Sequence, residues 1–557
     1  MALTGSLGTF HHPGVSRVDY KTLDMDRVLT ALLARLWHQG MPSKISRANT
    51  LDVEVFVKLF LQHPEAFDGF DREATTRWTA THLMDLVNRN KATEAVASPR
   101  PLHGFTYRFR NSRKSRPYGA DEQLYEMLAT DQGALAQLRE FFFSDVDGST
   151  GAITPGPGTD VETQALLHLV ELAGKQMQDR PDTGKPRTPY PPLCAEPARQ
   201  LCRDVMRLLY HQDHMPRTVL VDYLKILFAF HLSLYHLRMM KLLPAVVEAG
   251  AVDASCRKGH QGPDAGDRCP YRVRLFLDVE GTPGTAAAAL AERSAGIWYR
   301  RIPRFVQATY QVKKLDDFAE HLAAKTNKLS RPGGRNYFTP EESLRLLGKP
   351  YAKERDAFFL QRVNRVRDEE EDLPTELKQI TQLGLSPFDE YIEMLMHYKG
   401  RYYRRYFVDC LDSLLLKHRP GALLAQPRGG RSGAGADNAA RRFVLDARLL
   451  EVLLQVSLLR ESGDGSGNLG TAPMRVDEFL ALLRERYGLH IDQLPDSDGF
   501  FGAHLDDQAA LRANSAAFLN RLREIGYYQD MSDAYLTQTI TPRYTIGSGA
   551  TTGAVIR

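Results

Sequence analysis

The sequence predicts a mainly α-helical protein of several domains, with one short central β element and an α+β module at its C-terminal end. Three observations favour this fold class. Apolar residues recur at helical spacing near the N-terminus, for instance from Leu51 to Phe60. A long apolar stretch runs from Val219 to Met240. Residues 443–545 contain three more helical patterns, followed by a segment rich in Tyr and Thr.

The composition is that of an ordinary globular protein. The chain has 557 residues, of which 43% are hydrophobic and 25% are charged, so it lacks the composition of a disordered protein. This length exceeds one ordinary core and predicts about three or four domains. Because 72 basic and 68 acidic residues leave a net charge of only +4, any affinity for nucleic acid has to come from local basic patches.

The sequence predicts a cytoplasmic protein with no membrane partner. Its first residues lack the basic start and apolar run of a secretory signal. The stretch from Val219 to Met240 contains Asp222, Lys225 and Arg238, which a membrane interior would penalise, so a buried core helix is expected there. Five cysteines in a chain this long do not make a disulfide scaffold, and we expect reduced thiols or metal ligands.

The chain is expected to divide at segments rich in Gly, Pro and small polar residues. Residues 1–143 form an N-terminal helical domain, with helices predicted near 51–60, 76–89 and 121–142. Residues 144–193 form a linker-rich region with one helix, near 161–178. A central helical domain follows at 194–420, then a flexible linker at 421–442, and a C-terminal domain at 443–557.

The central domain is predicted to contain one strand among its helices. Residues 271–279 alternate apolar and polar side chains at the period of a strand. Helical patterns cover 285–328, 340–348, 352–368 and 386–417.

The C-terminal domain resembles a winged helix, because three helices precede an extended Tyr- and Thr-rich segment. In winged helices the third helix enters the DNA major groove and the hairpin touches the backbone. The resemblance implies that Arg512, Asn514, Arg521 and Arg523 face DNA and that Arg543 lies on the wing. Two features depart from the pattern: a long acidic link precedes the third helix, and that helix is only modestly basic. A protein-binding role would suit the same fold.

Three segments interleave basic and aromatic residues. The first, 100–118, carries Arg and Lys without any acidic residue. Guanidinium groups neutralise phosphates while rings stack on exposed bases, and TYRFR at 106–110 alternates like a strand. The second and third segments are 298–304 and 397–407. The alternative for each is a solvated face over buried aromatic residues. The candidate nucleic-acid contacts are Arg108, Arg110, Arg113, Lys114, Arg116, Arg401, Arg404 and Arg405.

A glycine-rich loop contains a candidate metal site. Cys256, His260 and Cys269 are thiol and imidazole ligands of the kind that structural zinc prefers. A structural site needs a fourth ligand, for which Cys194, Cys202, His211 and His214 are candidates. The alternative is a set of ordinary reduced thiols.

The predicted strand ends in an acidic pair, Asp278 and Glu280. An Asp-x-Glu in this place resembles the first motif of exonucleases with a ribonuclease-H-like fold, in which such carboxylates hold two metal ions beside the scissile phosphate. That family also needs further acidic motifs on neighbouring elements, and the residues that follow are predicted to be loop and helix instead.

The chain as a whole resembles the large accessory subunits encoded beside helicases, methyltransferases and nucleases in bacterial anti-phage operons. The resemblance implies a non-catalytic protein that acts on or beside DNA, with DNA and other protein subunits as partners and structural zinc as a candidate cofactor. Two alternatives remain: a metal-dependent nuclease that uses Asp278 and Glu280, and a scaffold that binds only protein. A nuclease requires several carboxylates near Asp278, whereas DNA binding requires the basic segments to share a face.

Overall fold

The structure is a computed structural model of the whole chain. It describes residues 9–46, 52–62, 69–88, 94–144, 154, 159–173, 178–184, 188–190, 192–253, 256, 269–326, 328–368, 374–426, 441–461, 469–500, 505–528 and 538–547.

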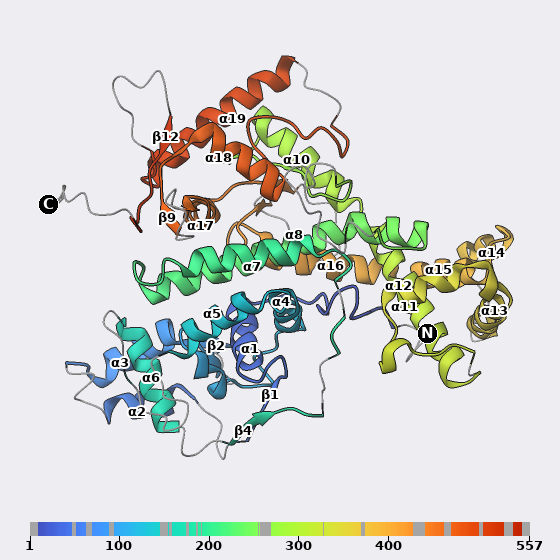
Figure 1. Cartoon of the computed structure of the whole chain (residues 1–557), viewed down its shortest axis with the longest axis horizontal. Coiled ribbons are helices and arrows are strands. Elements are labelled where there is room, and N and C mark those ends of the chain that lie inside the picture. The colour runs from blue at the N-terminus through green and yellow to red at the C-terminus, as the bar shows by residue number, and fades with distance from the viewer. Residues whose placement is uncertain are drawn as a thin grey trace.

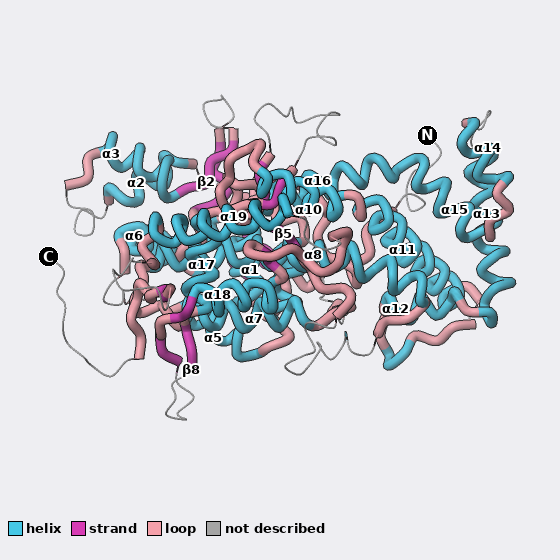
Figure 2. The backbone as a smooth tube through the Cα atoms, turned by 90° about the horizontal axis from the view of Figure 1, so that it is seen from above, coloured by secondary structure: helices cyan, strands magenta, loops and turns pink. Residues whose placement is uncertain are grey.

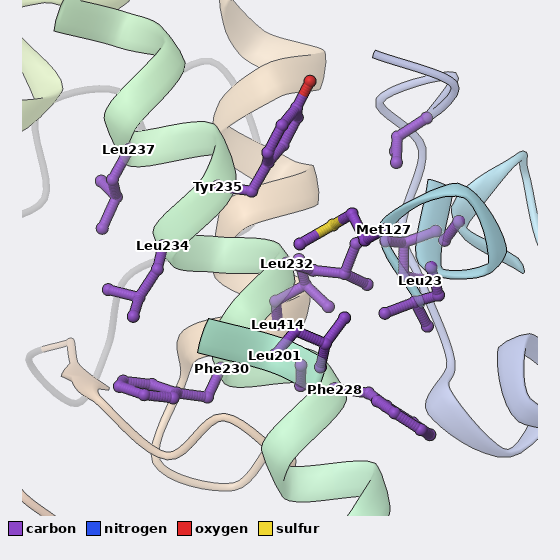
Figure 3. Close-up of a cluster of buried hydrophobic side chains, with 14 of the residues drawn as sticks. Leu23, Met127, Leu201, Phe228, Phe230, Leu232, Leu234, Tyr235, Leu237 and Leu414 are labelled. Atoms are coloured by element: carbon purple, nitrogen blue, oxygen red, sulfur yellow. The ribbon is translucent and has the colours of Figure 1, made fainter. Parts of the chain in front are cut away.

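One long helix, α8 (Arg217–Ala249), forms the axis of the molecule. Figure 1 shows α7 and α8 crossing the middle, with α1, α4 and α5 on one side and α17, α18 and α19 on the other. Apolar side chains leave α8 in several directions and meet Leu23, Met127, Leu201 and Leu414 from surrounding elements (Figure 3). A helix that is apolar on all sides has to be covered on all sides, so the rest of the fold surrounds α8.

Burial distinguishes α8 from a membrane span. Among the described residues, it is the helix that is long and apolar enough to cross a bilayer, but 78% of its most apolar window is buried inside the protein. This is the environment of a core helix in a soluble protein, as the sequence predicts.

The N-terminal elements cover one side of α7 and α8. They are α1 (Met25–Trp37), β1 (Ser43–Ser46), α2 (Val53–Leu61), α3 (Arg72–Trp78), the π-helix η2 (Thr79–Leu83), β2 (Met84–Val87), β3 (Ala95–Pro99), the 3₁₀-helix η3 (Gly104–Phe109), α4 (Ala120–Leu128), α5 (Gln132–Phe143), α6 (Val161–Ala173), β4 (Gln178–Pro181) and α7 (Glu196–Leu209).

The central elements run from β5 to α16. They are β5 (Leu275–Phe276), α10 (Ala286–Tyr299), α11 (Ile302–Ala324), η4 (Pro332–Gly334), α12 (Pro340–Leu344), η5 (Arg345–Leu347), η6 (Lys349–Tyr351), α13 (Ala352–Asp368), α14 (Thr375–Gln382), α15 (Pro387–Leu395), the π-helix η7 (Met396–Gly400) and α16 (Arg401–Leu415). In Figure 2 the helices dominate, and α13 and α14 lie at one end of the molecule.

The C-terminal elements alternate short strands with helices. They are β6 (Leu424–Ala425), β7 (Arg442–Phe443), α17 (Ala447–Ser457), β8 (Leu459–Glu461), β9 (Leu469–Thr471), β10 (Met474–Arg475), α18 (Val476–Leu482), the π-helix η9 (Leu483–Tyr487), β11 (Leu489–His490), α19 (Leu505–Glu524) and β12 (Thr539–Ile540). The mainly helical fold class is confirmed.

Several local predictions need correction. TYRFR is not a strand, because it lies in the 3₁₀-helix η3. The helix expected over 76–89 ends early: α3 gives way to η2 and then to strand β2. The helix expected over 121–142 is two helices, α4 and α5, and Asp131 caps the second by accepting from the Gly133 and Ala134 amides. The expected strand 271–279 is reduced to β5, with a further bridge between Asp278 and Val444.

The described strands form two-stranded pairs, two of which join segments that the sequence assigns to different domains. β1 pairs antiparallel with β4, and β5 pairs parallel with β11. The first pair links residues 1–143 to 144–193, and the second links 194–420 to 443–557. The domain division therefore stays a prediction, and these pairs would cross it.

The winged-helix arrangement of the C-terminal part is not confirmed. The hairpin β8–β9 lies between α17 and α18, and β12 pairs antiparallel with β10, which directly precedes α18. On the buried side of α19, the Asn514 amide donates to the carbonyls of Leu277 and Ile491 at 2.8 and 2.9 Å. The expectation that Asn514 faces DNA is therefore wrong, because this fully buried side chain holds α19 against the β5–β11 region.

A buried ionic network ties the two sides of α8 together. The Asp204 carboxylate on α7 lies 2.8 Å from His231 Nε2 on α8 and accepts from the Tyr487 hydroxyl of η9 at 2.9 Å. Arg486 of η9 completes the network with an ion pair to the same carboxylate. Burial would raise the pKa of Asp204, but Arg486 and the hydrogen-bond donors outweigh it and lower the pKa.

We predict that Asp204→Asn strongly destabilises the protein. The substitution leaves Arg486 buried without its counter-charge, and breaking a buried pair in this way costs about 3–5 kcal/mol. Urea denaturation followed by circular dichroism measures the change, with the exposed Asp213→Asn on the adjoining loop as the control. Equal stabilities for the two variants would contradict the prediction.

The same network predicts sensitivity to acid. The Asp204 pKa is lower in the folded chain than in the unfolded chain, where a free Asp has a pKa of about 3.9. The stabilisation is therefore complete above the unfolded pKa and is lost as the pH falls through the folded value. Urea titrations from about pH 7 to about pH 3 should show the stability gap between wild type and Asp204→Asn narrowing below about pH 4. A gap independent of pH would argue against the network.

Candidate nucleic-acid interface

A pocket of about 1030 Å³ lies between the N-terminal elements and α16. It brings together two of the three basic and aromatic segments found in the sequence, 100–118 and 397–407, with a third wall from residues 9–21. The lining residues are Thr9, Phe10, His11, Asp19, Tyr20, Lys21, Arg35, Pro42, Arg110, Ser112, Ser115, Arg116, Pro117, Tyr118, Gly119, Asp121, Glu122, Lys399, Tyr402, Tyr403 and Tyr406.

Cations from all three segments face the pocket. Lys21, Arg116 and Lys399 belong to the three different walls, and Arg116 is exposed. Arg110 also lines the pocket, and its guanidinium donates to the Ser43 carbonyl at 3.2 Å. Because the walls are distant in sequence, the fold concentrates positive charge that the net charge of the chain does not reveal.

The acidic residues of one wall are already neutralised by arginines. Arg35 Nε lies 2.6 Å from Asp121 Oδ2, and Arg35 Nη2 lies 3.0 Å from Glu122 Oε2. Arg17 adds a second pair to Glu122, at 3.0 Å. The wall that contains Asp121 and Glu122 therefore does not cancel the charge of Lys21, Arg116 and Lys399.

Tyrosines of α16 form the aromatic wall. Tyr402 is 51% exposed, whereas Tyr403 packs on Phe10 with stacked rings 4.2 Å apart. The hydroxyls of Tyr402 and Tyr406 hydrogen-bond at 2.5 Å, and the Lys21 ammonium lies 3.8 Å from the Tyr406 ring centroid. The hydrogen bond with Tyr402 lowers the pKa of Tyr406, and Lys21 acts in the same direction. This wall offers π-faces beside a fixed positive charge.

The floor of the pocket is built from unusual backbone. Tyr20 and Tyr118 both adopt left-handed φ values, 51° and 50°, which non-glycine residues rarely do and which cluster at functional sites. The Asp19 amide donates to the Tyr118 carbonyl at 2.9 Å. Gly119 follows with φ 78°, and a Cβ there would lie 1.9 Å from the Arg17 carbonyl oxygen. Glycine is required at 119 because the two backbone segments touch.

Three buried polar atoms around the pocket lack a hydrogen-bond partner among the described residues. They are His11 Nε2, Ser115 Oγ and Asp121 Oδ1. Burial lowers the pKa of His11, so its ring is neutral at pH 7 and offers one donor and one acceptor. Unpaired buried polar atoms are costly and rare, and these three are placed where a bound molecule could satisfy them.

The other residues predicted in segment 100–118 lie outside the pocket lining. Arg108 turns toward β4, where its Nε lies 3.4 Å from Asp179 Oδ2. Arg113 and Lys114 are exposed on the turn that precedes Arg116. The expectation that Phe105 and its neighbouring rings stack on bases is wrong, because the rings of η3 are buried in the core. Tyr118 is the ring of this segment that reaches the pocket.

The arginines of α16 flank the tyrosine wall. Arg401 and Arg405 are exposed next to Tyr402 and Tyr406, and Arg405 lies 3.9 Å from Asp409. Arg404 is half-buried. These positions put α16 cations beside the pocket without making them part of its lining.

Helix α19 lies on the other side of α8 from the pocket (Figure 1). Arg512 and Arg523 are exposed on it, and Arg521 pairs with Glu524 at 3.1 Å. Arg543, expected on a wing, pairs with Glu451 at 3.0 Å. The predicted arginines of α19 therefore do not share a surface with the pocket cations.

The acidic pair of the nuclease alternative is not grouped with other carboxylates in the part of the chain that the structure describes. Asp278 is fully buried, its Oδ1 accepts from the Gly281 amide at 3.0 Å, and its Oδ2 lies 3.6 Å from Arg442 Nε. Burial raises the pKa of Asp278. Glu280 is exposed. The geometry gives the nuclease alternative no support.

The cysteines of the candidate metal site are buried. The Ala195 amide donates to the Cys256 carbonyl at 2.9 Å, and the hydrogen bond with Cys256 lowers the pKa of Cys194 to about 6, with Arg238 acting in the same direction. Cys269 Sγ lies 3.7 Å from the Arg238 guanidinium. His260 lies outside the described residues. Within those residues no group of three ligands is placed to hold a metal ion, so zinc binding stays a prediction.

Sequence reasoning missed the first wall of the pocket. Phe10, His11, Tyr20 and Lys21 stand in a short irregular segment without periodicity. The adjacent histidines and the basic Lys21 were visible, but their value depends on residues about a hundred and four hundred positions away.

The fold and the pocket define a mainly helical protein that carries a basic, tyrosine-lined pocket beside its core helix. Over residues 6–544 the chain matches the family of methylation-associated defense system protein MAD7, and it belongs to that family. No curated protein matches the chain. Membership confirms the expected resemblance to proteins of defence operons.

We predict that Gly119→Ala damages the pocket floor. The new Cβ would meet the Arg17 carbonyl oxygen in addition to the strain of a left-handed alanine. Gly284→Ala is the matched control, because Gly284 has φ 87° and open space around it. Thermal denaturation should show Gly119→Ala less stable than the control by about 1–3 kcal/mol, the usual cost of overpacking. Equal stabilities would mean that the Arg17 and Gly119 backbones are not in contact.

Proposed function

We propose that this defence-system protein is a cytoplasmic, non-catalytic accessory subunit that contacts DNA through the pocket between its N-terminal elements and α16. The observation that carries the proposal is the convergence of Lys21, Arg116 and Lys399 with the tyrosines of α16 in one pocket. Cations that neutralise phosphates next to rings that accept stacked bases are the combination that single-stranded nucleic-acid binding uses.

Exposed cations extend the proposed contact beyond the pocket. Arg113 and Lys114 stand on the turn beside Arg116, and Arg401 and Arg405 stand on the helix that carries the tyrosines. A DNA strand that enters the pocket would meet these groups along its backbone. They would add sequence-independent affinity that falls as salt rises.

A separate feature favours other protein subunits as partners. Leu360, Leu383 and Leu385 are large exposed apolar side chains on or next to α13 and α14, which lie at one end of the molecule (Figure 2). Exposed apolar groups of this kind mark surfaces that other proteins cover. We propose that this end contacts another subunit, and Leu383→Asp should then weaken assembly without changing DNA affinity.

Fluorescence anisotropy with a labelled single-stranded oligonucleotide tests the DNA contact. We predict that Arg116→Gln with Lys399→Gln weakens binding and lowers the slope of log affinity against log salt by about two, one for each lost phosphate contact. The matched control is Arg512→Gln with Arg523→Gln on α19, which should bind like the wild type.

The control also discriminates between the two DNA-binding hypotheses. Loss of binding in the α19 variant alone would contradict the pocket and favour the winged-helix interpretation. Absence of binding by the wild type at any salt concentration would leave the protein-binding scaffold as the function.

A further inference from the structure

We infer that the pocket takes a single unstacked nucleotide of a DNA strand, with the base against Tyr402 and its hydrogen-bonding edge toward His11, Ser115 and Asp121. This inference rests on the proposed function and names the part of DNA that the pocket would bind. The volume of about 1030 Å³ is in the range of sites that enclose a small ligand. It excludes a duplex, which would need an open groove.

The aromatic wall offers a free face for stacking. Tyr402 is half-exposed, and its ring meets those of Tyr403 and Tyr406 edge to face, at centroid distances of 5.4 and 4.2 Å. Tyr403 is held by Phe10, and Tyr406 is held by the Tyr402 hydroxyl and Lys21. The neighbours of Tyr402 are therefore fixed while its own face is open, as a base-stacking platform requires.

The polar atoms of the pocket suit the edge of a base. Asp121 Oδ2 is occupied by Arg35, so Oδ1 is an acceptor with a remaining site. An amino group of adenine, cytosine or guanine would satisfy it, as carboxylates do with the amino group of cytosine. Ser115 Oγ donates or accepts, and neutral His11 offers Nε2 in either role. Thymine has no amino group, so it would satisfy Asp121 less well.

The phosphate of the same nucleotide would lie among the cations. Lys21 and Lys399 come from opposite walls, and Arg116 is exposed near the acidic residues that Arg35 neutralises. A phosphate and a base can thus be met at once by charge and by ring. A free nucleotide presents the same chemistry as a nucleotide within a strand, and the experiment separates the two sources.

The test uses the full-length protein and a single-stranded oligodeoxynucleotide that carries one 2-aminopurine, whose fluorescence reports stacking. We expect binding to change the emission in the single strand and not in a perfectly paired duplex. Tyr402→Leu should weaken binding about fivefold or more, the scale of one lost stacking contact. Tyr402→Phe keeps the ring and should bind like the wild type, as should Tyr210→Leu, an exposed tyrosine on the α7 end.

A second comparison addresses the polar edge. Oligo-dA and oligo-dC should bind more tightly than oligo-dT to the wild type, and Ser115→Ala should reduce the difference. Free deoxyadenosine monophosphate is the probe for the other source. If it binds as tightly as the strand, the pocket serves a free nucleotide and the inference of a strand fails.

The outcomes separate this inference from the proposed function. If DNA binds with a salt dependence that Arg116→Gln with Lys399→Gln lowers, while 2-aminopurine emission and Tyr402→Leu show no effect, the nucleotide inference is overturned and the DNA contact stands. If no DNA of any kind binds, both are overturned. A preference for RNA of the same sequence would also overturn the inference.

Discussion

The burial of α8 on all its sides is the constraint on which the rest of the structure depends. A helix with apolar side chains around its whole circumference cannot lie on a surface, so α7, α11 and α16 pack against it along its length. The Asp204 network adds a polar link at the one place where α7, α8 and η9 meet. Charges there are tolerated because each of them has a partner.

The pocket follows from this arrangement. Elements from the first hundred and twenty residues and helix α16 both lie against the core helix, so their basic and aromatic side chains meet although the sequence separates them widely. The left-handed Tyr20 and Tyr118 and the contact of Gly119 with Arg17 show how closely the backbones approach. Local backbone strain and unpaired polar atoms occur together at this place, a combination that is typical of binding sites.

Much of the fold could be predicted because helices report themselves through local periodicity. The core position of α8 and the helices of the central region were predictable on this basis. Alternation failed for TYRFR, because its rings are buried in a 3₁₀-helix and the two-residue pattern there has no sheet to belong to. The basic segments were visible in the sequence, but their convergence was not, since it depends on packing around α8. His11 and Lys21 carried no local signal at all.

The three walls of the pocket also set an order on its formation during synthesis. A chain emerges from the ribosome N-terminus first and folds as it appears. The helices α1, α4 and α5 leave the ribosome long before Tyr402 and Tyr406, so the nascent protein presents the cations of its first two walls without the aromatic third. Until about four hundred residues have emerged, the early part of the chain is a bare basic surface, and any binding by the completed pocket belongs only to the nearly finished protein.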